Sequence, residues 1–158
     1  MLIQGKLLSF GVDLTEAAYI KRKVFIEEQG FAENLVFDEQ EQFAVHALVY
    51  QGLNQINAVA TGRIVFDGDT CTMNYIAVLN EYRGNHYGDF AVRLLLNKAF
   101  NVEIEKIIVN SPLTCIGFYE KIGFVQEGGE FIEAGVSQVK MSICSKGVLT
   151  ECNKVKKI

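Results

Sequence analysis

An α+β fold, with a mixed sheet flanked by helices in a single domain, is the fold class that this sequence predicts. The chain has 158 residues, of which 49% are hydrophobic, and one proline, so it holds enough apolar material for one core. Its apolar patterns switch between strand and helix periods in the order β α β β β α β α β β. No repeat or linker interrupts that order. We therefore expect one domain over residues 1–158, with a core at about 3–144 and a C-terminal tail at 145–158.

The N-terminal part of the chain predicts a strand, a helix and a connector. Residues 3–10 form a short apolar run that is typical of a strand. Asp13 offers an N-cap for a helix over residues 14–29, where apolar residues recur at helical spacing, and Gly30 ends that helix. Residues 31–43 are acidic and aromatic without strong periodicity, so we expect them to form a connector.

Three antiparallel strands are predicted in the middle of the chain. Residues 44–50 and 56–66 are typical of a hairpin, with turn residues between them. Asp67-Gly-Asp69 then predicts a tight turn into a third strand at 70–78.

The C-terminal half predicts two helices and three strands. The apolar run over residues 89–102 is too long and continuous for a strand and predicts a buried helix. A short β-branched strand follows at 106–109, and then a helix at 114–122. The last two strands are expected at 124–127 and 138–144, and sheet extension through the last strand would permit a homodimer.

Composition excludes several classes of protein. The formal net charge of −4 and the pI near 5.2 argue against a nucleic-acid partner, and the basic run of Lys154, Lys156 and Lys157 lies in the expected tail. No apolar stretch reaches the roughly 18 residues that span a bilayer, and residues 1–10 lack the pattern of a signal peptide. The cysteines form no C-x-x-C pair, and no neighbouring histidine could complete a zinc site with them. We therefore expect a cytoplasmic protein with no membrane partner and no metal.

The segment YIAVLNEYRGNHYGDF, at residues 75–90, carries the strongest functional signal. It predicts a strand that runs through a loop directly into a helix. The first N–H groups of a helix have no partners within it, and together with the helix dipole they favour a phosphate or pyrophosphate. Residues 83–89 would supply these amides, Gly84 and Gly88 would let the backbone approach closely, and Arg83 could add a cation.

Two motifs together resemble the signatures of the GNAT superfamily of N-acetyltransferases. They are the loop Arg83-Gly-Asn-His-Tyr-Gly88 and the segment Phe118-Tyr-Glu-Lys-Ile-Gly-Phe124. The run Arg22-Lys-Val-Phe-Ile-Glu-Glu-Gln-Gly30 is also similar to the first helix of a bacterial branch of that superfamily. The resemblance implies a GNAT-like, mostly antiparallel central sheet and an enzyme that moves an acetyl group from acetyl-CoA to a primary amine by direct transfer in a ternary complex.

The resemblance also implies roles for individual residues. The strand before the loop would open a splay in the sheet, where backbone groups would bind the pantetheine arm and polarise the thioester. Tyr119 would lie near the coenzyme sulfur and protonate the leaving thiolate, as a general acid. The implied cofactor-binding residues are Ile76, Ala77, Val78, Arg83, Gly84, Asn85, His86, Tyr87, Gly88, Asp89, Asn110 and Tyr119.

His86 departs from the family pattern, because the family usually has the first glycine of its loop there. A histidine keeps the backbone N–H, but a positive φ at this position would be strained. This departure motivates a rival hypothesis, a catalytically silent acyl-CoA-binding or regulatory module with the same fold. A dinucleotide-binding domain is excluded, because no Gly-x-Gly-x-x-Gly follows an early strand.

Two residues are candidates for the base that deprotonates the amine acceptor. Glu28 lies at the end of the first predicted helix, where an ordinary exposed glutamate is the alternative interpretation. His46 lies in an alternating strand, where a core histidine is the alternative. Six acids and no basic residue lie between Val24 and Ala44, and they would attract a cationic amine if they lined the cleft. The acceptor could be a small amine, an amino sugar, a polyamine, an aminoglycoside or a peptide N-terminus.

Overall fold

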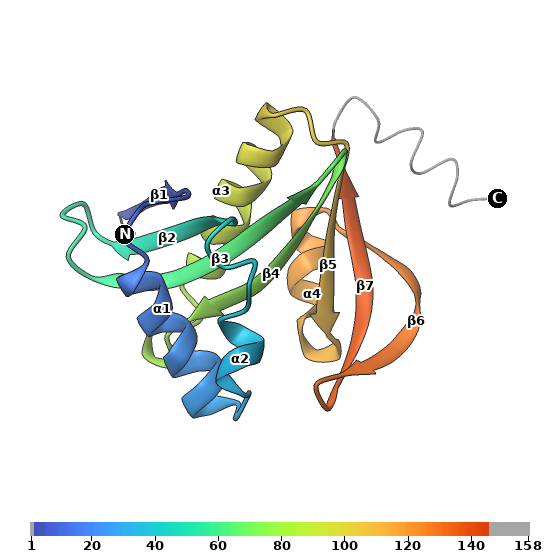
Figure 1. Cartoon of the computed structure of the whole chain (residues 1–158), viewed down its shortest axis with the longest axis horizontal. Coiled ribbons are helices and arrows are strands. Elements are labelled where there is room, and N and C mark those ends of the chain that lie inside the picture. The colour runs from blue at the N-terminus through green and yellow to red at the C-terminus, as the bar shows by residue number, and fades with distance from the viewer. Residues whose placement is uncertain (1, 146–158) are drawn as a thin grey trace. The chain divides into compact units, whose positions relative to one another are not determined.

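The computed structural model describes residues 2–145, and their elements follow the predicted order with additions. The bounds are β1 (Ile3–Leu8), α1 (Thr15–Lys21), the π-helix η1 (Arg22–Glu28), α2 (Glu33–Val36), β2 (Val45–Gln51), β3 (Ala58–Asp67), β4 (Thr70–Val78), the 3₁₀-helix η2 (Asn80–Tyr82), α3 (Tyr87–Asn101), β5 (Lys106–Pro112), the 3₁₀-helix η3 (Leu113–Cys115), α4 (Ile116–Ile122), β6 (Val125–Glu133) and β7 (Val136–Cys144). Figure 1 shows these strands and helices, and the pairings of β1 with β2, β2 with β3, β5 with β7 and β6 with β7 are antiparallel. The predicted α+β class with a mostly antiparallel sheet is confirmed.

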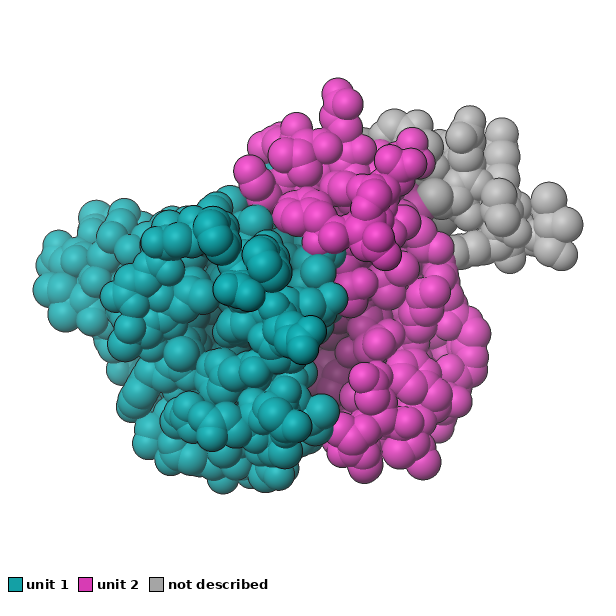
Figure 2. Space-filling model, in the orientation of Figure 1, with its two compact units in different colours: residues 1–65, 73–97 teal, residues 66–72, 98–158 magenta. Residues whose placement is uncertain are grey.

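The described residues divide into two units, coloured separately in Figure 2. The first comprises residues up to 65 together with 73–97, and the second comprises 66–72 together with the residues from 98 onward. The expected tail lies outside the described residues except for Ser145.

In the first unit the strands lie in the order β1-β2-β3-β4. Helices α1 and α2 cover one face of these strands, and α3 covers the other (Figure 1). The α1 side is a core cluster in which Ala17 and Ile20 pack with Leu48 and Tyr50 of β2. On the α3 side the contact is close, since a Cβ added at Gly5 of β1 would lie 2.4 Å from Leu94 Cδ1.

In the second unit β7 lies between β5 and β6. It pairs with Lys106–Pro112 on one side and with Val125–Glu133 on the other. Both edges of β7 already carry ladder partners within the chain, so this strand cannot extend the sheet into a second copy, and a homodimer stays a prediction without this route.

Several elements differ from the sequence-based expectations, among them β5, which runs to Pro112 rather than to residue 109. The connector 31–43 contains the short helix α2. The second half of the first helix is π-helical. Strand β6 extends to Glu133, beyond the expected end at residue 127, because the register shift between Glu127 and Glu130 takes up Gly128, whose φ is +79°. In the described part of the chain, no helix is both long and apolar enough to cross a membrane.

Candidate active site

Strand β4 carries a backbone distortion one residue before the predicted pantetheine-binding segment. Tyr75 has a φ of +53°, which is uncommon for a residue with a Cβ and costs of order 1–3 kcal/mol. Its side chain is held from several sides: the ring makes an edge contact with Phe25 at 5.3 Å between centroids, and the hydroxyl donates to the Leu35 carbonyl. Strain that is fixed by its surroundings in this way is concentrated at functional sites.

The last three residues of β4 are Ile76, Ala77 and Val78, the predicted backbone contacts of the coenzyme arm. Ala77 is buried in the core cluster that includes residues of α1, and this packing holds the end of β4 in place. The Val78 carbonyl accepts a hydrogen bond from Arg83 Nε at 3.0 Å. The strand end and the loop that follows are thus fastened to each other.

The loop between β4 and α3, the predicted pyrophosphate loop, leads directly into the first turn of the helix. Gly84 and His86 have φ angles of +83° and +68°. The N–H of Phe90 donates to the carbonyl of His86 at 3.0 Å, so the first turn of α3 begins directly after His86. The three amides that precede Phe90 have no carbonyl four residues earlier within the helix. They belong to Tyr87, Gly88 and Asp89. The sequence-based concern about His86 was well placed, because this histidine does occupy the left-handed region that glycine favours.

Side chains of the loop fix its path. Asn85 Nδ2 donates to the carbonyl of Tyr82 at 3.1 Å and to that of Arg83 at 3.3 Å. His86 is exposed, whereas Tyr87 is buried and its ring makes an edge contact with Tyr82 at 6.4 Å between centroids. Asp89 accepts a hydrogen bond from Arg93 one turn later in α3.

Glu28 and Arg83, two separately predicted site residues, are joined in the structure. Arg83 Nη1 and Nη2 donate to Glu28 Oε2 and Oε1, both at 2.8 Å, which is a bidentate pair. Glu28 ends the π-helix η1. A π-helix has more residues per turn than an α-helix, so the side chains at its end lie on a different face from the one that an α-helical projection predicts. The pair with Arg83 lowers the pKa of Glu28.

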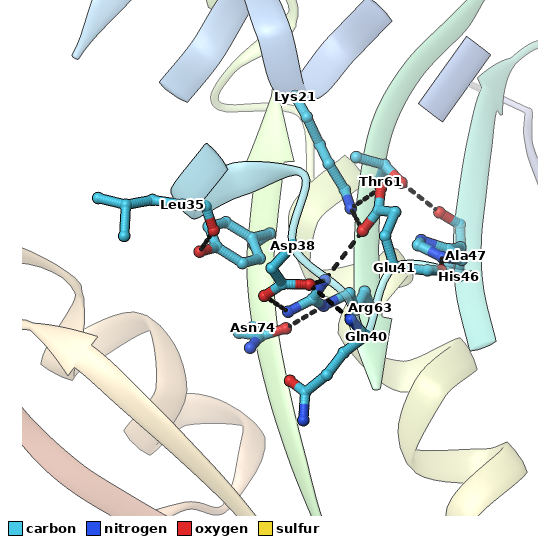
Figure 3. A network of polar contacts seen from close by, with 11 residues as sticks. Lys21, Leu35, Asp38, Gln40, Glu41, His46, Ala47, Thr61, Arg63 and Asn74 are labelled. Atoms are coloured by element: carbon cyan, nitrogen blue, oxygen red, sulfur yellow. Dashed lines mark hydrogen bonds and ion pairs between the residues drawn. The ribbon is translucent and has the colours of Figure 1, made fainter. Parts of the chain in front are cut away.

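His46 lies inside a buried polar network (Figure 3). It is 1% exposed, its Nε2 lies 2.9 Å from the Glu41 carbonyl oxygen, and its Nδ1 is buried without a hydrogen-bond partner among the described residues. Burial, and after it the nearby Lys21 cation, lowers the pKa of His46. The alternative interpretation of His46 as a core histidine agrees with this position.

Two fully buried cations organise the network. Lys21 Nζ donates to both carboxylate oxygens of Glu41 at 2.6 Å. Arg63 donates to Asp38 at 2.8 and 2.9 Å, to Glu41 at 2.9 Å and, through Nε, to Asn74 at 2.7 Å. These bonds attach the connector between α2 and β2 to helix α1 and strand β3, as Figure 3 shows.

The acidic residues between Val24 and Ala44 are mostly paired. Asp38 and Glu41 bind the buried cations, Glu28 binds Arg83, and two more acids bind bases of the first helix. These last pairs are Glu27 with Lys23 and Glu33 with Arg22. Five of the six acids are therefore neutralised by bases of the first unit, which weakens the expectation that they form an attractive field for a cationic amine.

The second unit holds Tyr119 and Asn110. Tyr119 lies on α4, is 6% exposed, and its ring makes edge contacts with Phe118 and Phe124 at 4.9 and 5.4 Å between centroids. Burial raises the pKa of its phenol well above the ordinary value, which makes the hydroxyl a weaker acid than that of an exposed tyrosine. Asn110 is exposed on β5, opposite Lys140 of β7.

Cys71 lacks the surroundings of an acyl-carrying nucleophile. Cys71 is buried, and burial raises its pKa to about 12, so its reactive thiolate form is scarce at neutral pH. Within residues 2–145 no group of three or more His, Cys, Asp or Glu side chains is arranged to hold a metal ion.

The buried cations and the strained Tyr75 were missed by the sequence reasoning. A signal for Lys21 was present, because it lies between Ile20 and Val24 on the apolar face of the predicted helix. Arg63 likewise interrupts an apolar strand. A basic residue on the apolar face of a helix or strand indicates a buried ion pair when acidic residues are abundant nearby in the sequence.

Comparison with known proteins gives a consistent result. Residues 15–145 match the family model described as an acetyltransferase (GNAT) domain. The uncharacterized protein YyaT of Bacillus subtilis is 34% identical over 141 residues, which are 87% of this chain and 93% of that protein. Among solved structures, Escherichia coli ElaA superposes with a TM-score of 0.77 at 18% identity over 89% of this chain and 99% of its own. The PaiA N-acetyltransferase of Thermoplasma acidophilum, solved in complex with coenzyme A, superposes with a TM-score of 0.68 at 13% identity, over 92% of this chain and 100% of its own.

Proposed function

Because the chain belongs to the GNAT acetyltransferase family and is thus an acyltransferase, we propose that it moves an acetyl group from acetyl-CoA to a primary amine of a small molecule or peptide. The transfer is direct, within a ternary complex of enzyme, acetyl-CoA and amine. The silent-module hypothesis is not favoured, since the matching family model describes acetyltransferases.

The observation that carries the proposal is the loop geometry at the start of α3. Positive φ angles at Gly84 and His86 turn the chain directly into the first turn of α3, and the N–H groups at the start of a helix suit a pyrophosphate. The fold neighbour PaiA was solved with coenzyme A, which supports the same choice of cosubstrate here.

The chemistry then follows from the proposed roles. Backbone amides of the loop bind the pyrophosphate, and the end of β4, at Ile76 and Val78, binds the pantetheine arm and polarises the thioester. The amine nitrogen attacks the thioester carbon, a C–N bond forms and the C–S bond breaks. A base accepts the proton from the amine, and the Tyr119 hydroxyl gives a proton to the departing thiolate.

Glu28 is the better supported of the two candidate bases. Its side chain is 40% exposed and lies beside the loop through Arg83, so it is accessible to an amine. His46 is 1% exposed, and its Nε2 is engaged by the Glu41 carbonyl. In this proposal Glu28 takes the amine proton and His46 supports the core.

Calorimetry with CoA and acetyl-CoA, followed by thiol-release assays on a panel of amines, tests the proposal. Micromolar binding together with thiol release and an acetylated product by mass spectrometry would support it. Binding without turnover across the panel would favour the silent module, and absence of binding would refute acetyl-CoA as cosubstrate.

A further inference from the structure

The ion pair between Glu28 and Arg83 connects the two sides of the proposed chemistry. Glu28 is the candidate base, and Arg83 begins the loop for the pyrophosphate. Arg83 directs both terminal nitrogens at Glu28, and its Nη1 also lies 3.3 Å from Asn80 Oδ1. Arg83, which we expect to bind the phosphate, is therefore held by Glu28, which we expect to bind the amine.

Of the five N–H donors of the Arg83 guanidinium, one is used by the Val78 carbonyl, two by Glu28 and one by Asn80. A single N–H remains, which is too few for a bidentate contact with a pyrophosphate while Glu28 is held. The Glu28 pair is readily exchanged, because both side chains are 40% exposed and exposed pairs contribute little to stability. A pyrophosphate at the start of α3 would meet the loop amides and the helix dipole as well as Arg83. The anion is therefore the stronger competitor for the guanidinium.

We propose that Arg83 exchanges Glu28 for the pyrophosphate of the acyl-CoA, so that Glu28 is released as a base only after the cosubstrate has bound. This inference rests on the proposed function. It makes Arg83 a positioning residue, because Arg83 acts on the amine only through the release of Glu28. In the released state the Glu28 carboxylate accepts the proton of the attacking amine.

The effect of Arg83 on the pKa of Glu28 also favours release of Glu28 after the cosubstrate has bound. While paired, Glu28 is a weak base, because Arg83 lowers its pKa. Loss of the pair would return the pKa of Glu28 toward that of an ordinary glutamate and make it a better proton acceptor. The enzyme would thus acquire its base at the moment when a thioester is present.

A double-mutant cycle on CoA affinity, measured by calorimetry, tests the exchange. The variants are Glu28→Gln, Arg83→Gln and their combination, with Glu27→Gln as the matched control. Glu27 is one residue away and also exposed, but it pairs with Lys23. Glu28→Gln should bind CoA about two- to fivefold more tightly, since it frees Arg83 from a surface pair. Arg83→Gln should bind about tenfold more weakly, and Glu28→Gln should add nothing in that background.

Each outcome decides between the alternatives. A gain from Glu28→Gln that persists without Arg83, or an equal gain from Glu27→Gln, would show a general charge effect and overturn the exchange. If wild type binds CoA and Glu28→Gln binds no more tightly, the exchange fails and the proposed function stands. If wild type and every variant fail to bind CoA, the proposed function fails and the exchange fails with it.

Carbon-13 NMR of the glutamate carboxyls gives a second readout that does not depend on turnover. The Glu28 resonance is assigned by its loss in Glu28→Gln. Addition of CoA should raise the pKa of Glu28. An unchanged pKa of Glu28 at saturating CoA would contradict the exchange.

Discussion

The guanidinium carbon of Arg63 lies 4.9 Å from the centroid of the Tyr75 ring, and Lys21 Nζ lies 5.6 Å from the same centroid. Two buried cations thus contact the one β4 residue with a left-handed backbone. Contacts of this kind are worth more when they are shielded from water. The network in Figure 3 therefore supports the distortion of β4 as well as the connector.

Loss of Arg63 should destabilise the protein strongly. Arg63→Met leaves the carboxylates of Asp38 and Glu41 without their buried partner, and breaking a buried pair costs about 3–5 kcal/mol. We expect the free energy of unfolding in urea to fall by that amount. Arg22→Gln, which breaks an exposed pair with Glu33, serves as the control and should cost less than about 1 kcal/mol. Equal losses in both variants would mean that the Arg63 network adds no more than a surface pair.

Lys21 should make the free energy of unfolding increase as the pH rises from about 8 to 10.5. Its pKa is lowered from 10.5 to about 8, chiefly by burial, while Glu41 acts in the opposite direction. Between these two values the unfolded chain binds more protons than the folded one, so the free energy of unfolding increases as the pH rises. Relative to Lys21→Met, wild type should gain roughly 3 kcal/mol between pH 8 and 10.5. Urea unfolding across this range measures the gain, and parallel curves for the two proteins would refute it.

Replacing His86 by glycine should relieve backbone strain. The left-handed conformation costs a non-glycine residue roughly 1–2 kcal/mol, while glycine adds 0.5–1 kcal/mol of chain entropy. We expect His86→Gly to be more stable by about 0.5–1 kcal/mol and to bind acetyl-CoA at least as tightly. Gly84→Ala, with a φ of +83° at the altered residue, is the converse control and should be destabilised. Thermal unfolding and calorimetry measure both effects, and a less stable His86→Gly would show that the histidine ring compensates for the strain.

Removal of the Tyr119 hydroxyl should slow turnover without weakening cofactor binding. Tyr119→Phe keeps the ring contacts with Phe118 and Phe124 but removes the proton donor. The turnover number should fall about a hundredfold, a typical contribution of a general acid, while the affinity for CoA stays near that of wild type. Thiol-release kinetics and calorimetry separate the two quantities. Turnover equal to wild type would remove Tyr119 from the mechanism.

The order of strands and helices was predictable because it depends on local apolar periodicity. The helix ended by Gly30 and the strand at 70–78 were found from such signals alone. Helix α2 was not, because four residues give too short a window for a period. The extent of β6 was missed because Gly128 and Gly129 resemble a turn, whereas they lie at a register shift.

The candidate site was predicted residue by residue but not as a set of contacts. Sequence spacing located the loop at 83–89 and suggested Glu28, yet the pair between Glu28 and Arg83 joins residues 55 positions apart. A π-helical turn sets the direction of Glu28, and no pattern in the sequence signals that turn. Partners at such separation follow from tertiary structure, which local patterns do not encode.

The interior position of β7 has a consequence for synthesis on the ribosome. Strands β1 to β4 pair in chain order, so their sheet can form once residue 78 has emerged. Strands β5 and β6 are joined through β7, which ends at Cys144. The nascent C-terminal unit must therefore wait for its last strand, and a ribosome stalled before residue 136 would hold two strands that lack the one between them.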